Sequence, residues 1–193
     1  NVAACLIVLL GSLLGTESPL TITQMLWVNL IMDTFAAGAL ASLPPNERVM
    51  KDKPRRSGKD GDFIITRPMA YNIFGVGFAF VVILMGLLFY FHAQDGLTPH
   101  DLSWFFSFFV MLQFWNMFNA KAFMEGRSAF ANLKDSKSFL LVALLILIGQ
   151  YLIVTFGGEM FSVIPLPLED WAIIIGSSSL VLWIGELFRL FKR

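Results

Sequence analysis

Cysteine and charge are both scarce in this sequence, and each scarcity argues against a class of function. Cys5 is the single cysteine, so the chain forms no disulfide within itself, and a redox role is not expected. Charged residues make up 15% of the chain, and its 14 basic residues balance its 14 acidic ones, which argues against nucleic acid as a partner. The first residues, from Asn1 onward, carry no basic leader and do not resemble a signal peptide.

Apolar residues, in contrast, are abundant: they make up 56% of the chain, and the mean hydropathy is +0.70. This composition is typical of a polytopic membrane protein. We therefore predict an all-α membrane helix bundle with one partial and five complete transmembrane helices. The partial helix covers residues 2–14, too few to cross a bilayer, which takes roughly 20 residues, and we interpret it as the outer part of a helix that begins earlier. The complete spans are predicted at residues 24–43, 69–92, 102–124, 138–156 and 171–191.

The distribution of basic residues predicts which loops face the cytoplasm. Seven lie in residues 48–67, four in residues 121–137, and three at the end of the chain, which accounts for all 14. The other loops carry acidic residues but no Lys or Arg. By the positive-inside rule the basic loops are cytoplasmic, including the loop of residues 44–68.

Two polar residues interrupt the second apolar segment. Asn29 and Asp33 lie four residues apart, so on a helix their side chains share one face and could hold one ion between them. Burying an ionised carboxylate at membrane depth costs free energy, so such residues are rare. An acidic residue in this position is therefore interpreted first as part of an ion or proton site. Calcium takes about six to eight oxygen ligands, of which these two residues supply two or three. The alternative is that Asp33 is neutral or hydrogen-bonded within the bundle.

Further amides lie in residues 102–124 at spacings of three. Gln113, Asn116 and Asn119 therefore fall on one side of a helix. For Asn116 and Asn119 we favour hydrogen bonds between neighbouring helices, whereas Gln113 fits either that role or the ion path. Asn1 is a fourth amide that lies deep in the membrane if its helix continues upstream.

These residues carry a resemblance to a known family. The run QMLWVNLIMDT at residues 24–34, with ASLPP at 41–45 and MKDKPRR at 50–56, resembles the sixth transmembrane helix and following loop of calcium-pumping P-type ATPases, especially the plasma-membrane type. The resemblance covers the whole chain and is strongest over residues 24–68. It implies that the six segments are the family's fifth to tenth helices, the C-terminal half of the membrane domain.

The resemblance also implies a site. Asn29 and Asp33 match calcium ligands, and Asn1 matches the asparagine of the fifth helix. Pumps with two calcium sites carry a glutamate where Ala4 stands here, an acid at the place of Gln113 and a threonine at the place of Met32. These departures suggest that one site is absent and that one calcium moves per cycle.

The rest of such a pump is expected upstream of Asn1. The resemblance places there a fourth-helix carboxylate, the phosphorylated aspartate, and the domain that binds ATP and magnesium. No phosphate-binding glycine loop or phosphorylation motif occurs in the 193 residues, so ATP hydrolysis is not expected of this piece alone. The implied partners are the calcium ion, membrane lipid and the upstream half of the pump. Because the sequence ends at Arg193, soon after the last span, we do not expect a calmodulin-binding tail and favour a bacterial inner membrane or a lower-eukaryotic plasma membrane.

Three smaller features have two interpretations each. The basic loop either fixes topology and contacts anionic lipid, or docks against the phosphorylation domain. His92 and His100 are expected to be exposed loop residues and not a metal pair. Glu186 and Arg189, at spacing three, are expected to form an ion pair at the cytoplasmic interface and to take no part in transport.

The main hypothesis is therefore the membrane part of a calcium-exporting P-type ATPase. One alternative is a structural helix bundle in which Asp33 is inert. The other is a P-type pump for a different divalent cation such as manganese, which has similar oxygen-ligand needs.

Overall fold

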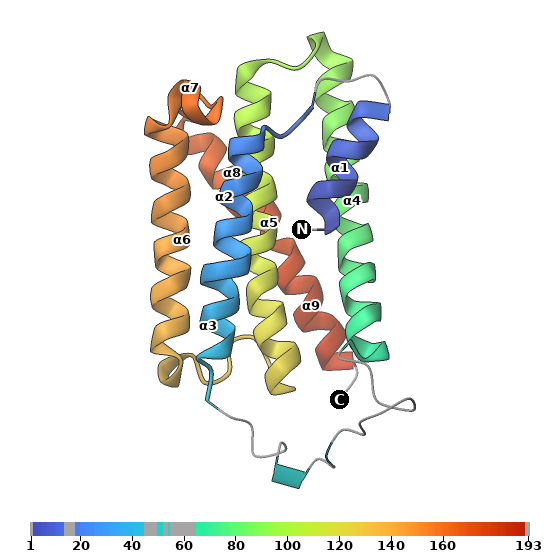
Figure 1. The fold of residues 1–193 in the computed structure, drawn as a ribbon, viewed down its shortest axis with the longest axis vertical. Helices are drawn as coiled ribbons and strands as arrows, with labels where there is room; N and C mark the ends of the chain where they lie inside the picture. Colours follow the sequence, from blue (N-terminus) through green and yellow to red (C-terminus); the bar gives the residue numbers. More distant parts are fainter. Residues whose placement is uncertain (1, 14–17, 45–49, 52–53, 55–64, 192–193) are drawn as a thin grey trace.

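The computed structural model describes residues 2–13, 18–44, 50–51, 54 and 65–191, and gives only the backbone of residues 32, 33, 94 and 95. This part of the chain is helical and contains no strand (Figure 1). The α-helices are α1 (Val2–Leu13), α2 (Ile22–Asn29), α3 (Ala37–Ala41), α4 (Arg67–Asp95), α5 (Pro99–Glu125), α6 (Lys137–Phe156), α7 (Gly158–Phe161), α8 (Leu168–Ser178) and α9 (Leu180–Phe191). The π-helix η1 (Leu30–Ala36) joins α2 to α3, and the 3₁₀ turn η3 (Leu133–Asp135) precedes α6.

Local sequence explains where the helices begin. Thr21 caps α2 and Thr98 caps α5, each in a capping box with the residue three positions later, Gln24 and Asp101. Thr66 caps α4, where a proline in the first turn needs no hydrogen-bond partner. α5 ends at Gly126, whose left-handed backbone suits a residue without a side chain.

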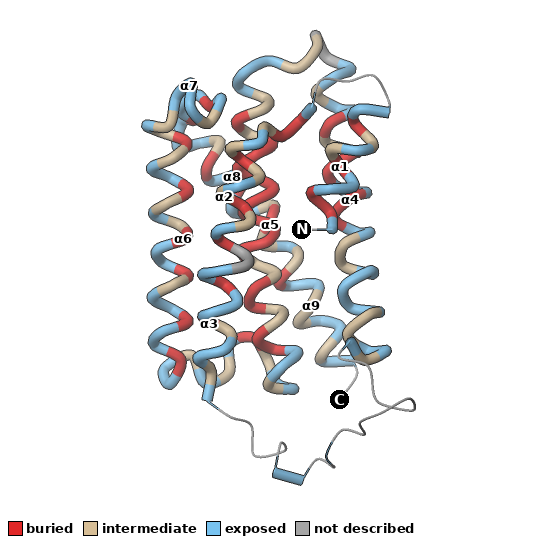
Figure 2. The backbone as a smooth tube through the Cα atoms, in the orientation of Figure 1, coloured by how far each residue is buried: buried red, intermediate tan, exposed pale blue. Residues whose placement is uncertain are grey.

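Helix α5 forms the centre of the bundle. It packs against α4, α6, α8 and α9, and buried residues follow it along most of its length (Figure 2). Its many phenylalanines fill this core: Phe105, Phe106 and Phe109 are almost completely buried. A central helix touches protein on most sides, so it can carry polar residues that a lipid-facing helix cannot.

Three helical stretches are long and apolar enough to cross a membrane: Arg67–Ala93, Lys137–Phe156 and Leu168–Phe191. They agree with three of the predicted spans. The predicted span at 24–43 is instead divided among α2, η1 and α3. The central helix α5 is continuous, but polar residues stand among its apolar ones. The outer face of α6 shows why lipid suits the bundle, because it exposes large apolar side chains at helical spacing, Leu141, Leu144, Leu145 and Ile148.

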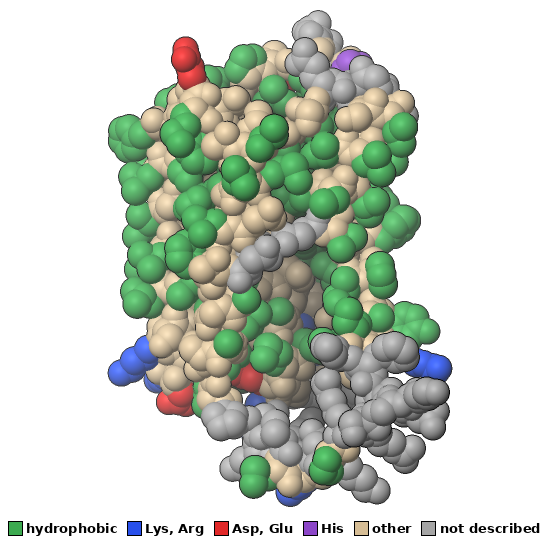
Figure 3. Space-filling view, viewed as in Figure 1, with side chains coloured by type: hydrophobic (Ala, Val, Ile, Leu, Met, Phe, Trp, Pro, Cys, Tyr) green, Lys and Arg blue, Asp and Glu red, His purple; other side chains and the backbone are tan. Residues whose placement is uncertain are grey.

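The predicted topology agrees with the arrangement of the helix ends. α3 ends, α4 begins, α5 ends, α6 begins and α9 ends at the lower end of the bundle in Figure 1, and in the sequence each of these helix ends adjoins one of the basic segments. In the space-filling view, hydrophobic side chains cover the flanks and most of the visible Lys and Arg lie near that end (Figure 3). α1 begins near mid-height and runs toward the opposite end, as expected for the outer part of a span.

The predicted last helix, residues 171–191, is divided between α8 and α9 at Ser179. The hydroxyls of three consecutive serines, Ser177, Ser178 and Ser179, each donate to a backbone carbonyl three or four residues earlier. Such bonds compete with the helical N–H groups and often bend helices, which accounts for the interruption.

Candidate ion site

Asn29 is the last residue of α2, and Asp33 lies within the π-helix η1. The sequence indicated one continuous α-helix here, but the structure widens it over Leu30–Ala36. π-Helical turns are rare and are frequently found at functional sites. Asn29 is half-buried, whereas the side chain of Asp33 lies outside the described structure, as does all of Asn1. Their roles as calcium ligands therefore stay predictions.

Gln113 faces a cavity of about 580 Å³ beside this widened segment. Its side chain is buried, and its Nε2 atom has no hydrogen-bond partner among the described residues. The same cavity is lined by Val2 and Ala3 of α1 and by Ala36 and Ala37 at the junction of η1 and α3. The structure thus brings Gln113 close to the start of α1 and to the end of the segment that carries Asp33.

Asn119 makes the interhelical bonds predicted for it. Its Nδ2 atom donates to the carbonyl oxygen of Val181 in α9 at 3.0 Å, and its Oδ1 atom accepts from Arg189 at 2.9 Å. Asn116 and Asn119 both line the 580 Å³ cavity and a neighbouring cavity of about 910 Å³ between α4, α5 and α9. The amide face of α5 therefore lies along two adjoining cavities.

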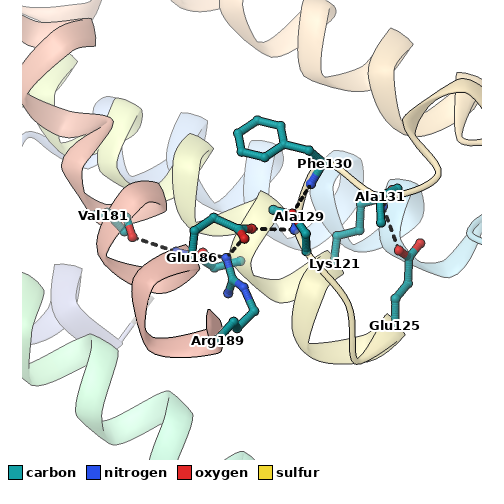
Figure 4. A network of polar contacts seen from close by, with 10 residues as sticks. Lys121, Glu125, Ala129, Phe130, Ala131, Val181, Glu186 and Arg189 are labelled. Atoms are coloured by element: carbon teal, nitrogen blue, oxygen red, sulfur yellow. Dashed lines mark hydrogen bonds and ion pairs between the residues drawn. The ribbon is translucent and has the colours of Figure 1, made fainter. Parts of the chain in front are cut away.

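A polar network joins α5, the following turn and α9 at the predicted cytoplasmic end (Figure 4). Glu186 pairs with Arg189 at 2.8 Å, which confirms the predicted ion pair, and also accepts from the backbone N–H of Ala129 at 2.6 Å. Lys121 is fully buried and donates to Glu125 at 2.8 Å and to the carbonyl oxygen of Ala131 at 2.6 Å.

Sequence reasoning assigned Lys121 only to a basic loop and missed its buried contacts. Its spacing of four from Glu125 was the available signal. At the other end of the bundle, His100 is half-exposed and its Nε2 atom lies 2.7 Å from Asp170, which ties α5 to α8. His92 is exposed near the end of α4. Within the described residues no group of three or more His, Cys, Asp or Glu side chains is placed to hold a metal ion.

The helix α2 is fixed to its neighbours near both ends. Trp27 donates through Nε1 to the Oε1 atom of Gln150 in α6 at 2.9 Å. At the outer end, the Nε2 atom of Gln24 donates to the carbonyl oxygen of Phe161 at 2.9 Å. Neither contact could be predicted from local spacing, because each joins residues more than 120 positions apart.

Comparison with known families decides what kind of bundle this is. Residues 17–191 match the model of the family described as "Cation transporting ATPase, C-terminus". The chain belongs to this family. The match spans α2 to α9, so the second apolar segment and the polar network both lie in a cation-transporting ATPase C-terminus.

The names of individual relatives are more specific about the cation than the family description is. The chain is 35% identical over 200 residues to plasma membrane calcium-transporting ATPase 1 of Homo sapiens, an alignment that covers 97% of the chain and 16% of that protein. It is 36% identical over 194 residues to plasma membrane calcium-transporting ATPase 2 of Oreochromis mossambicus, covering 94% of the chain and 17% of the relative. The chain thus spans about one sixth of the length of these relatives.

Proposed function

We propose that this chain is the C-terminal half of the membrane domain of an ATP-driven calcium pump, and that it supplies Asn29 and Asp33 to one intramembrane calcium site. The observation that carries the proposal is the position of Asp33 in a π-helical segment of a membrane bundle that belongs to the cation-transporting ATPases. A widened turn alters the backbone hydrogen bonding, so it can release carbonyl oxygens to an ion. The names of the relatives support calcium as the ion.

A single calcium site fits the residues nearby. Ala4, at the place of a glutamate in two-site pumps, is buried in an apolar core, and Gln113 offers a neutral amide in place of an acid. Gln113 and Asn1 are secondary candidates for the same site. The parent pump would supply a further carboxylate, the phosphorylation domain, ATP and magnesium, and would act as a translocase in a plasma membrane or a bacterial inner membrane.

The test is ATP-driven calcium uptake by vesicles that contain the full-length pump. Asp33→Asn should abolish uptake because it removes the negative charge that compensates the calcium ion for its lost water ligands. Asn29→Ala should weaken uptake. Asp101→Asn is the matched control, since its side chain caps the outer end of α5 and lies beside His100, at the opposite end of the bundle from the amide face of α5. Undiminished uptake by Asp33→Asn, or uptake of manganese but not calcium by the unmodified pump, would contradict the proposal.

A further inference from the structure

We infer that Gln150 and Gly149 of α6 are positioning residues for the ion site, acting through Trp27. This inference rests on the proposed function. It assigns a role to α6, a helix that supplies none of the proposed ligands. The observation that carries it is the contact of the Trp27 indole with Gln150 and Gly149 of α6, which we call the indole seat. Trp27 lies two residues before Asn29 and close to the π-helical segment.

The polar half of this seat is the hydrogen bond from Trp27 to Gln150. Gln150 is completely buried, and the bond is 2.9 Å long. Its second amide atom, Nε2, is also buried and makes no hydrogen bond among the described residues. Trp27 is half-buried, and Gln150 is the acceptor of its indole N–H, so this bond restrains the rotation of α2.

The apolar half of the indole seat is formed at Gly149, which has no side chain and so leaves room for the Trp27 ring. A Cβ atom at this position would lie 3.0 Å from Cη2 and 3.1 Å from Cζ2 of Trp27. Nine in ten real contacts of a Cβ atom are longer than this, so a larger residue would require the Trp27 ring to shift by a few tenths of an ångström against α6. Glycine weakens a helix interior, and the close approach of the indole accounts for its presence here.

The consequence for the ion site follows from the stiffness of α2. Gln24 fixes the outer end of α2 through Phe161, and Trp27 fixes its inner part through Gln150. Asn29 lies two residues after Trp27 at the end of α2, and η1, which follows directly, also packs against α6. Ligands must be held closely to bind an ion well, so loss of the indole seat should lower calcium affinity without removing a ligand.

The experiment measures calcium-dependent ATP hydrolysis of the full-length pump over a range of calcium concentrations. Gln150→Leu and Trp27→Phe should each raise the calcium concentration for half-maximal activity about tenfold, the equivalent of one hydrogen bond, with little change in the maximal rate. Because both changes break the same bond, the double variant should be no worse than either single one. Gly149→Ala should shift the midpoint in the same direction.

Controls separate positioning from simple destabilisation. Tyr151→Phe alters an exposed neighbour on α6, and Gly86→Ala adds a methyl group where no atom lies within 4 Å; both should leave the calcium midpoint unchanged. Additive effects of Trp27→Phe and Gln150→Leu, or variants that lose thermal stability while keeping the normal calcium midpoint, would overturn the inference. If Asp33→Asn is inactive but Gln150→Leu has a normal midpoint, the inference fails and the proposed function stands. Normal transport by Asp33→Asn would instead refute the proposed function.

Discussion

The carboxylate of Glu186 in α9 accepts a hydrogen bond from the backbone N–H of Ala129 at 2.6 Å, 57 residues earlier in the chain. Ala129 is fully buried in the turn after α5, and Glu186 also pairs with Arg189. Arg189 in turn reaches Asn119. One acidic side chain therefore ties the turn after α5 to the last helix and helps to hold the amide face of α5 in place.

Glu186→Ala should destabilise the membrane domain. It leaves the buried N–H of Ala129 without its acceptor and Arg189 without its ion pair, a loss of about 1–3 kcal/mol. Thermal unfolding of the purified full-length pump in detergent measures this effect. Glu169→Ala, at an exposed position in the first turn of α8, is the control and should change the unfolding temperature far less.

Lys121→Met should be more damaging than most changes of a surface lysine. The ammonium group is fully buried and satisfies the carbonyl oxygen of Ala131 as well as pairing with Glu125, so its removal is expected to cost about 3 kcal/mol. Lys134→Met, at an exposed position in η3, provides the comparison. Equal yields and equal unfolding temperatures for the two variants would show that the buried contacts contribute little.

Two glycines of the last span offer a matched pair. A Cβ atom at Gly185 would collide with the Oδ1 atom of Asn119. A Cβ atom at Gly176 would have no neighbouring atom within 4 Å. Gly185→Ala should therefore displace Asn119 and lower the unfolding temperature. Gly176→Ala should be neutral or stabilising by up to about 1 kcal/mol, because alanine favours helix. A stabilised Gly185→Ala variant would mean that Asn119 moves aside without cost.

The ratio of calcium transported to ATP hydrolysed should be one. The reason is chemical: Ala4 and Gln113 carry no charge, so only one calcium can be neutralised by the acids of the site. Sealed vesicles with the full-length pump allow both fluxes to be measured together. A ratio of two would contradict the argument from these positions.

Local patterns in the sequence predicted much of the fold but few of the contacts between residues that are distant in the chain. The span at residues 138–156 agrees with α6 because its apolar run and its boundaries are local properties. The pairing of Glu186 with Arg189 was equally accessible, since spacing of three on a helix brings the two together. The predicted orientation in the membrane rests on the basic residues alone and stays a prediction.

The features that sequence reasoning missed depend on neighbours distant in the chain. The spacing of Lys121 from Glu125 signals an ion pair but not the burial of the lysine, whose second acceptor, the carbonyl oxygen of Ala131, lies ten residues later in the turn after α5. The seat of Trp27 on Gln150 likewise requires two helices to pack side by side. The widening of the helix at η1 had one signal, the presence of Asn29 and Asp33 in an apolar helix, because such side chains compete for backbone hydrogen bonds.

The most direct test of the calcium site is equilibrium binding of radioactive calcium to the full-length pump and to its Asp33→Asn variant. We expect the unmodified pump to bind one calcium ion per molecule and the variant to bind none in the same concentration range. Calcium binding by Asp33→Asn with unchanged affinity would contradict the account.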